Sequence, residues 1–237
     1  MDWLTDRPIA HRGLHSETVP ENSIRAFEEA VDAGYPIECD VRLSVDGVPV
    51  VFHDSELDRM TDQRGFVSET TSEQLVEYSL LDSDESIPRF ETVLETVDGA
   101  VPLLVELKTA GKSGGLESAV TDRLDAYDGE FAVQSFNPLT VAWFRTRRPG
   151  WPRGQLSGFF DGSNVGFLRR SVMKRLLPNL YTRPDFVGYN HENLPYPPVR
   201  RVRKRGKPVL GWTVRSAETF DRVEPYVDNV IFEEFRP

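Results

Sequence analysis

The chain has 237 residues, of which 39% are hydrophobic and 28% are charged. This composition suits a soluble, well-packed domain of the size of a single α/β barrel, and it excludes a disordered chain. The formal net charge of −10 disfavours binding to nucleic acids, so we expect no nucleic-acid partner. The same charge would repel an anionic substrate, and a site for one would need local positive charge, most simply a divalent cation.

The sequence offers no sign of export or of a membrane span. Cys39 is the only cysteine, so an intramolecular disulfide is excluded. The N-terminal residues lack the pattern of a signal peptide, and no run approaches the roughly 20 apolar residues of a transmembrane helix. We therefore expect a cytoplasmic protein without stable membrane insertion.

Short apolar runs rich in β-branched residues alternate with longer amphipathic stretches, which is typical of repeated βα units. Eight strands are predicted, at Pro8–Ala10, Pro36–Leu43, Leu103–Leu107, Phe131–Gln134, Gly154–Gly158, Asp185–Gly188, Val209–Val214 and Asn229–Phe232. Helices are predicted between several of them, at Asn22–Ala33, Ile87–Val97, Leu116–Tyr127, Pro138–Arg145 and Ser216–Val223. Eight parallel strands close a barrel, so the predicted fold is α/β, a TIM-type (β/α)₈ barrel.

A hairpin is predicted after the second strand, because Asp46 and Gly47 lie between two β-rich runs. With these two as the loop, paired residue numbers sum to 93 and Asp40 faces His53. The polar segment Asp54–Ser86 that follows is expected to be a small insertion on the barrel rim. It looks too short to need a core of its own, so residues 1–237 are predicted to form a single domain.

Three carboxylates are the candidate metal ligands. Glu38 and Asp40 are two residues apart on a predicted strand, so both project from one face. Taken alone, this alternation fits the polar half of an exposed edge strand equally well. Glu106 favours the functional interpretation, because it ends the most apolar strand and catalytic groups gather at that end of barrel strands. Together the three form an oxygen-rich shell suited to one Mg²⁺ or Ca²⁺.

Several cationic and imidazole side chains are predicted near these carboxylates. Lys108 shares the face of Glu106, where it could form a structural ion pair or meet a phosphate oxygen. In His11-Arg12-Gly13, at the end of the first strand, arginine suits phosphate binding, glycine allows close backbone approach, and histidine exchanges protons. A lone histidine after a strand is more often structural. With His53 beside the acidic pair, however, the two imidazoles could serve as general acid and general base.

Three further features carry weaker signals. Gln134 ends a strand and could make a polar contact, although an ordinary exit from the strand explains it equally well. Trp212 could line the barrel mouth or pack in the core. The basic run Arg200–Arg205 is interpreted as the solvated face of a helix that precedes the seventh strand.

The ordered set of motifs resembles that of the glycerophosphodiester phosphodiesterases. Each motif alone is common, whereas the ordered set is highly specific and extends from residue 8 to the end of the chain. The motifs are His11-Arg12-Gly13, Pro20-Glu21-Asn22-Ser23, Glu38-x-Asp40-Val41, Val50–Asp54, Glu106-Leu107-Lys108, Gln134-Ser135-Phe136 and Trp212-Thr213-Val214.

The resemblance implies a barrel related to the phosphatidylinositol-specific phospholipases C and a small glycerophosphodiester substrate, cleaved to an alcohol and sn-glycerol 3-phosphate. It implies metal ligation by Glu38, Asp40 and Glu106 and acid/base roles for His11 and His53. Arg12 and Lys108 match phosphate contacts, Asn22 a position near the metal and phosphate, and Trp212 one near the glycerol. The attacking nucleophile is either water or the glycerol 2-hydroxyl, and the sequence leaves both open.

Two alternative functions are compatible with the same residues. A lysophospholipase D acting on lipid phosphodiesters would need a wider apolar rim, which the polar segment Asp54–Ser86 disfavours. A non-catalytic barrel that binds phosphodiesters would be expected to have lost a metal ligand or a histidine, whereas all five positions are filled here.

Overall fold

The computed structural model describes residues 1–109, 111–160 and 166–237. These residues group into two compact units. The first comprises Met1–Ile9 and Ala132–Pro237, and the second comprises Ala10–Phe131. Among the described residues, none of the helices combines the length and apolar character that crossing a bilayer requires.

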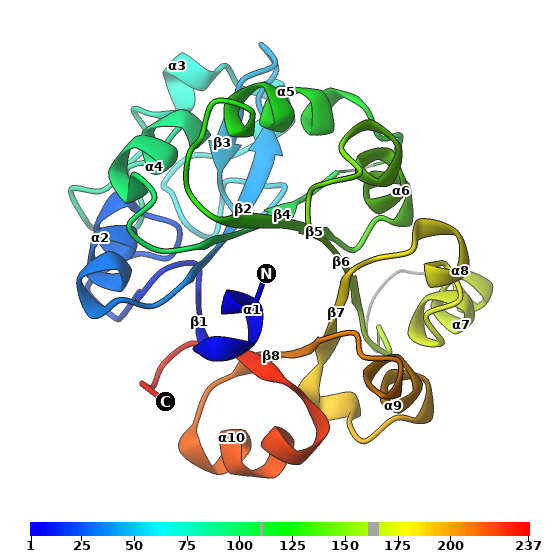
Figure 1. Ribbon diagram of the computed structural model, residues 1–237. Helices are drawn as coiled ribbons and strands as arrows, with labels where there is room; N and C mark the ends of the chain where they lie inside the picture. The colour runs from blue at the N-terminus through cyan, green and yellow to red at the C-terminus, as the bar shows by residue number, and fades with distance from the viewer. Residues whose placement is uncertain (110, 161–165) are drawn as a thin grey trace. The chain divides into compact units, whose positions relative to one another are not determined.

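The second unit is built on three parallel strands, β1, β2 and β4, with β3 antiparallel to β2. Helices α2 and α4 lie side by side next to these strands (Figure 1). The elements from β1 to α5 are β1 (Ile9–His11), α2 (Ile24–Ala33), β2 (Ile37–Leu43), β3 (Pro49–Val51), the 3₁₀ turn η1 (Val67–Glu69), α3 (Ser72–Leu75), α4 (Phe90–Val97), β4 (Leu103–Leu107) and α5 (Gly115–Leu124).

The first unit contains five strands, β5 to β9, each parallel to its neighbour. Its elements are α1 (Trp3–Asp6), β5 (Phe131–Ser135), α6 (Pro138–Arg147), β6 (Arg153–Ser157), α7 (Phe167–Lys174), α8 (Asn179–Thr182), β7 (Phe186–Asn190), η2 (His191–Asn193), α9 (Pro197–Lys204), β8 (Val209–Val214), α10 (Ala217–Val223), η3 (Glu224–Tyr226) and β9 (Asn229–Phe232). The run Arg200–Arg205 falls mostly within α9, directly before β8, as predicted.

The eight parallel strands of the described residues alternate with helices in chain order, which confirms the predicted (β/α)₈ fold class. Each predicted strand is present, with ends that differ by at most two residues. Helix α2 begins two residues later than predicted, because Ser23 is its N-cap and accepts a hydrogen bond from the backbone N–H of Ala26. Gly34 ends the same helix in the left-handed conformation, with φ +70°.

The predicted hairpin exists, but its predicted register was wrong by one residue. Arg42 pairs with Val50, so paired numbers sum to 92. Ser44 and Val48 close a three-residue loop in which Gly47 has φ +79°, a common hairpin geometry. Asp40 therefore faces Phe52, whose N–H donates to the Asp40 carbonyl at 2.9 Å, and His53 lies one residue beyond.

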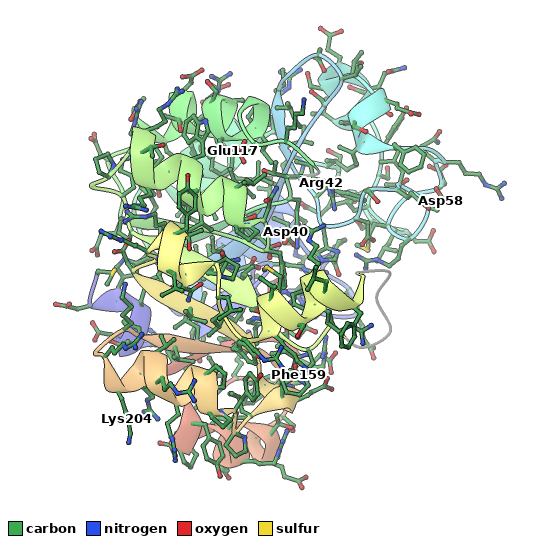
Figure 2. The ribbon with its side chains drawn as sticks, turned by 90° about the vertical axis from the view of Figure 1, so that its right-hand side faces the viewer. Asp40, Arg42, Asp58, Glu117, Phe159 and Lys204 are labelled. Carbon is green, nitrogen blue, oxygen red and sulfur yellow. The ribbon has the colours of Figure 1, made fainter. Side chains whose placement is uncertain are left out.

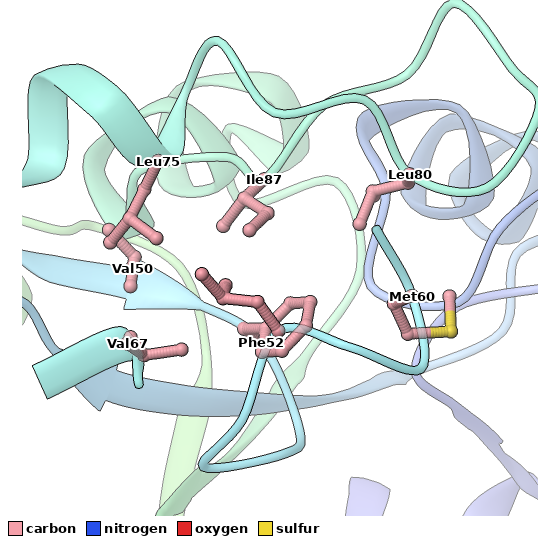
Figure 3. Close-up of a cluster of buried hydrophobic side chains, with 8 residues drawn as sticks. Val50, Phe52, Met60, Val67, Leu75, Leu80 and Ile87 are labelled. Carbon is pink, nitrogen blue, oxygen red and sulfur yellow. The ribbon is translucent and has the colours of Figure 1, made fainter. Parts of the chain in front are cut away.

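The segment between β3 and α4 does have a small core, contrary to expectation. Its apolar residues pack with two side chains of the preceding hairpin strand and its extension, Val50 and Phe52 (Figure 3). We call this group the insertion core; its buried members are Val50, Phe52, Leu57, Met60, Val67, Leu75, Leu80 and Ile87. These apolar residues are scattered among acidic and hydroxyl side chains without a period, so the composition of the segment concealed them.

Candidate active site

The three candidate metal ligands lie together in the second unit. Strands β2 and β4 pair in a register that sets Asp40 beside Glu106, and Glu38 projects from the same face two residues before Asp40. One carboxylate oxygen from each residue lies within 4.8 Å of the others. All three side chains are buried, so the alternative of an exposed edge strand is wrong.

This burial sets the electrostatics of the cluster. The pKa of the Glu38 carboxyl is raised well above its usual value, because the group is buried and faces the charges of Asp40 and Glu106. Burial likewise raises the pKa of Glu106. Burial opposes ionisation of Asp40 too, but the nearby ammonium of Lys108 and guanidinium of Arg12 hold its pKa well below the usual range. The cluster thus concentrates negative charge that a further cation would stabilise.

Two basic side chains contact the carboxylates. Lys108 Nζ lies 2.9 Å from Asp40 Oδ1 and 2.5 Å from Glu106 Oε1. Arg12 Nε lies 3.0 Å from Asp40 Oδ2. Lys108 was expected to form either a structural ion pair or a contact to a phosphate oxygen, and the structure shows the ion pair.

The loop between β1 and α2 adopts a constrained conformation beside the cluster. Arg12 and Asn22 both have positive φ, +56° and +57°. The Asn22 side chain donates to Asp40 Oδ2 at 3.0 Å, and its carbonyl accepts from the Asp40 N–H at 3.3 Å. Left-handed conformations of residues other than glycine persist only where the surroundings hold them, as these contacts to Asp40 do.

Gly13 is needed where its loop packs against a helix. Its φ is +81°, and a Cβ there would lie 2.7 Å from the backbone of Ala26 in α2. The glycine therefore allows the loop to approach α2, so close approach to a phosphate is not needed to explain it.

The two predicted catalytic histidines both lie near the carboxylates. His11 Nε2 is 3.9 Å from Glu38 Oε2. His53 is close enough to Asp40 for that charge to act on its pKa, although the paired partner of Asp40 is Phe52. Burial dominates and lowers the pKa of the His53 imidazole to about 4. His53 is therefore neutral near pH 7.

His53 is fixed at both its backbone and its ring. Two nitrogens of Arg42, Nε and Nη2, donate to the His53 carbonyl at 2.9 and 2.6 Å. The ring nitrogen Nδ1 lies 2.7 Å from Asp54 Oδ1. A carboxylate on Nδ1 fixes the ring orientation and leaves Nε2 as the nitrogen available to a ligand.

A chain of ion pairs that was not predicted from the sequence connects the surroundings of His53 to those of Arg12. Arg59 Nε donates to Asp54 Oδ2 at 2.5 Å, and Arg59 Nη2 donates to Glu21 Oε1 at 2.6 Å. Glu21 Oε1 also accepts from Arg12 Nη1 at 2.6 Å. Glu21 and Asp54 were visible in the motifs without an assigned role, whereas no sequence signal marked Arg59. We call Asp54, Arg59 and Glu21 the carboxylate–arginine bridge.

The remaining two predicted site residues belong to the first unit. Gln134 is buried on β5. Trp212, on β8, is half-buried, and its ring meets that of Phe136 edge-on with centroids 5.4 Å apart. Trp212 and Phe136 also line a small cavity of about 200 Å³ with Phe160 and Asn190. The contact of Gln134 and Trp212 with substrate stays a prediction.

The donor set is chemically suited to a hard divalent cation. Each of the three buried residues offers a carboxylate oxygen, the ligand type that Mg²⁺ and Ca²⁺ prefer. Fewer than six protein ligand atoms would leave positions for water or for oxygens of a substrate.

Comparison with known proteins gives a consistent result. The model of the glycerophosphoryl diester phosphodiesterase family matches residues 11–234. The protein YhdW of Bacillus subtilis (strain 168) is 32% identical over 94% of this chain and 92% of its own. The glycerophosphodiester phosphodiesterase of Caldanaerobacter subterraneus subsp. tengcongensis is 29% identical over the same shares.

Solved structures show the same fold. A phosphodiesterase from Oleispira antarctica, in complex with the product sn-glycerol-3-phosphate, has a TM-score of 0.84 over 98% of this chain and 94% of its own, at 22% identity. The glycerophosphodiester phosphodiesterase from Thermotoga maritima has a TM-score of 0.73 over 95% and 93%, at 25% identity.

The fold is that of a (β/α)₈ barrel, and the family match over residues 11–234 makes this chain a phosphodiester hydrolase. The chain belongs to the glycerophosphoryl diester phosphodiesterase family.

Proposed function

We propose that this enzyme hydrolyses glycerophosphodiesters to an alcohol and sn-glycerol 3-phosphate, with one divalent metal ion and two histidines. The observation that carries the proposal is the cluster of three buried carboxylates with His11, His53, Arg12 and Lys108 around it. Membership of the family, and the relative with bound sn-glycerol-3-phosphate, support the substrate.

Glu38, Asp40 and Glu106 would hold the cation, either Mg²⁺ or Ca²⁺. When bound, such an ion supplies Lewis-acid stabilisation of the negative charge that develops on the phosphoryl oxygens. Asn22 orients Asp40 through the two hydrogen bonds between them. Arg12 and Lys108 would add positive charge next to the phosphate, and each already lies beside a carboxylate of the cluster.

The two histidines have the chemistry for proton transfer on either side of the phosphorus. His53 is neutral near pH 7 because burial lowers its pKa to about 4, so in the free enzyme it can accept a proton at Nε2. Asp54 on Nδ1 would stabilise the imidazolium that results. His11 would serve as the complementary group. Gln134 and Trp212 are proposed to contact the remainder of the substrate.

Release of sn-glycerol 3-phosphate from glycerophosphocholine tests the proposal. We expect release with Mg²⁺ or Ca²⁺, loss on adding EDTA, loss in Glu106→Gln, and a large reduction to a residual rate in His11→Ala and His53→Ala. Glu95→Gln, which changes an exposed glutamate on α4, is the matched control and should keep full activity. Release that is unaffected by EDTA would refute the role of the metal, and failure of several glycerophosphodiesters would refute the substrate.

The pH dependence tests the histidine roles separately. With the proposed metal site saturated, protonation of His53 removes the base, so kcat/KM should fall as the pH drops through about 4. This fall in kcat/KM near pH 4 should be absent from the residual activity of His53→Ala. If that variant kept the fall, His53 would not be the group responsible.

A further inference from the structure

Positive charge is concentrated in one stretch of this acidic chain. Residues 138–207 contain 15 of the 28 lysines and arginines but only 3 of the 38 aspartates and glutamates. Their net charge is +12, whereas the rest of the chain carries −22. A charge asymmetry of this size indicates an anionic partner for the basic part.

The same stretch carries the most exposed apolar side chains of the described residues. Phe167 is 86% exposed, Leu168 76%, Leu180 78% and Tyr181 64%, and Leu177 is 48% exposed. No other large apolar residue among those described exceeds 55%. Exposed apolar groups that gather in one segment mark an interaction site, whereas scattered ones need no explanation.

The exposed residues lie on α7, on α8 and on the turn between them, next to α9. In Figure 2 these three helices are on the side that faces the viewer, with Lys204 at the end of α9. Residues 167–183 include five arginines and lysines and no acidic residue. Of these, Arg169, Arg175 and Arg183 are exposed. We call α7, residues 175–183 and residues 197–207 the basic–apolar surface.

A groove of about 230 Å³ joins the apolar and basic parts of this surface. Leu177 and Leu180 line it from one side, and Arg201 and Arg205 of the α9 region line it from the other. Arg175 and Lys207 also line it, and none of the described lining residues is acidic. A phosphate group in the groove would meet several cations while leucine side chains lie beside it.

These features together distinguish between kinds of anionic partner. Binding of a nucleic acid requires cations for its phosphates. Aromatic side chains can stack on its bases, but exposed leucines add nothing to such a site. The surface of an anionic bilayer uses both, because arginine and lysine attract the lipid phosphates while aromatic and leucine side chains enter the boundary between headgroups and acyl chains.

We propose that the basic–apolar surface binds the enzyme reversibly to anionic lipid bilayers. Phe167, Leu168 and Leu180 enter the interface, and Arg175, Arg201 and Arg205 contact lipid phosphates. This binding does not depend on the proposed catalytic function, since every residue involved lies in the first unit and none belongs to the carboxylate cluster.

Co-sedimentation of the full chain with vesicles tests the proposal. We expect binding to vesicles of phosphatidylcholine with 30% phosphatidylglycerol, no binding to phosphatidylcholine alone, and weakening as the NaCl concentration rises. Arg201→Gln/Arg205→Gln should weaken binding by at least about tenfold, since each cation near an anionic surface contributes about fivefold. Phe167→Ser/Leu168→Ser should reduce binding by a similar factor.

The controls separate this surface from general hydrophobicity and from catalysis. Leu81→Ser changes a leucine that is 52% exposed elsewhere, and it should bind vesicles normally. His53→Ala should also bind normally, so a failure of the catalytic proposal would leave this result unaffected. The proposal is overturned if the vesicles are not bound, if Phe167→Ser/Leu168→Ser binds unchanged, or if a DNA or RNA oligonucleotide binds more tightly than the vesicles.

Discussion

Glu21 connects the two ends of the candidate site. Its carboxylate accepts from Arg12, which contacts Asp40, and from Arg59, which holds the aspartate that orients His53. The hydrogen bonds from Arg59 and the charge of Arg12 lower the pKa of Glu21 despite its burial. The carboxylate therefore stays ionised, and the bridge together with Arg12 keeps two positive and two negative groups in fixed positions.

Replacing Arg59 should affect turnover without touching a reacting group. We expect Arg59→Ala to lower kcat by about 10- to 100-fold, the range seen when outer partners of functional side chains are removed, with a smaller change in KM. Arg59→Lys should recover part of the loss, because it keeps the charge but cannot contact both carboxylates with a planar fork. Steady-state kinetics with glycerophosphocholine provide the measurement.

Arg25→Ala is the matched control for that experiment. Arg25 is an exposed arginine on α2 that pairs only weakly with Glu29, at 3.5 Å. Its replacement should leave kcat unchanged. Equal effects of Arg25→Ala and Arg59→Ala on kcat would show that the bridge does not position the site.

The positions of some site residues could be predicted from the sequence, and those of others could not. The same-face placement of Glu38 and Asp40 follows from strand alternation, and their burial beside Glu106 follows from the carboxyl ends of neighbouring parallel strands. Arg59 could not be found in this way. It acts through contacts to Glu21 and Asp54, 38 and 5 residues away, and no local pattern encodes such a long-range pair.

The insertion, residues 54–86, supplies two side chains next to the candidate site, so the geometry of the site depends on the stability of this segment. Asp54 and Arg59 both come from it, and the insertion core anchors it to β3 through Val50 and to the adjoining Phe52. The positions of these two polar side chains therefore depend on the packing of apolar ones in the same segment.

A core substitution in the insertion should consequently reduce both stability and activity. Leu75 is fully buried, so Leu75→Ala should lower the free energy of unfolding of this segment by about 2–5 kcal/mol. Hydrogen exchange of the amides in residues 54–86 and kcat would report the two effects. Leu81→Ala, at a position that is 52% exposed, should change the stability by less than about 0.5 kcal/mol. If Leu75→Ala left both exchange and kcat unchanged, the insertion core would not support the site.

Elements were easier to predict than their exact pairing. Strands such as Leu103–Leu107 have continuous β-rich apolar runs, and their bounds agree with the sequence-based prediction. The hairpin register failed because Asp-Gly permits both two- and three-residue loops, and the choice depends on where the strands are held. Here the Ser44 hydroxyl, which donates to the Val48 carbonyl at 2.9 Å and accepts from its N–H, favours the longer loop.

For the whole molecule, the buried carboxylates predict that the proposed metal stabilises the fold. A ligand that binds only the folded state at 100 times its Kd contributes about 2.7 kcal/mol. In a chain of this length that corresponds to a rise in Tm of about 5–10 °C. Thermal unfolding with and without Mg²⁺ or Ca²⁺ measures this, and Glu106→Gln should lose the rise while Glu95→Gln keeps it. An equal rise in both variants would place the stabilising ion elsewhere.

The two units also differ in how the chain builds them, and this has a consequence for biosynthesis. The second unit is one continuous run, so a ribosome has delivered the carboxylates and both histidines by residue 131. The first unit combines Met1–Ile9 with the C-terminal half, and the Asn229 side chain donates to the carbonyls of Leu4 and Arg7 at 2.9 and 2.6 Å. Trp3 and Leu4, which are buried in the folded protein, therefore complete their packing only after Asn229 has been synthesised, more than 220 residues later in the chain.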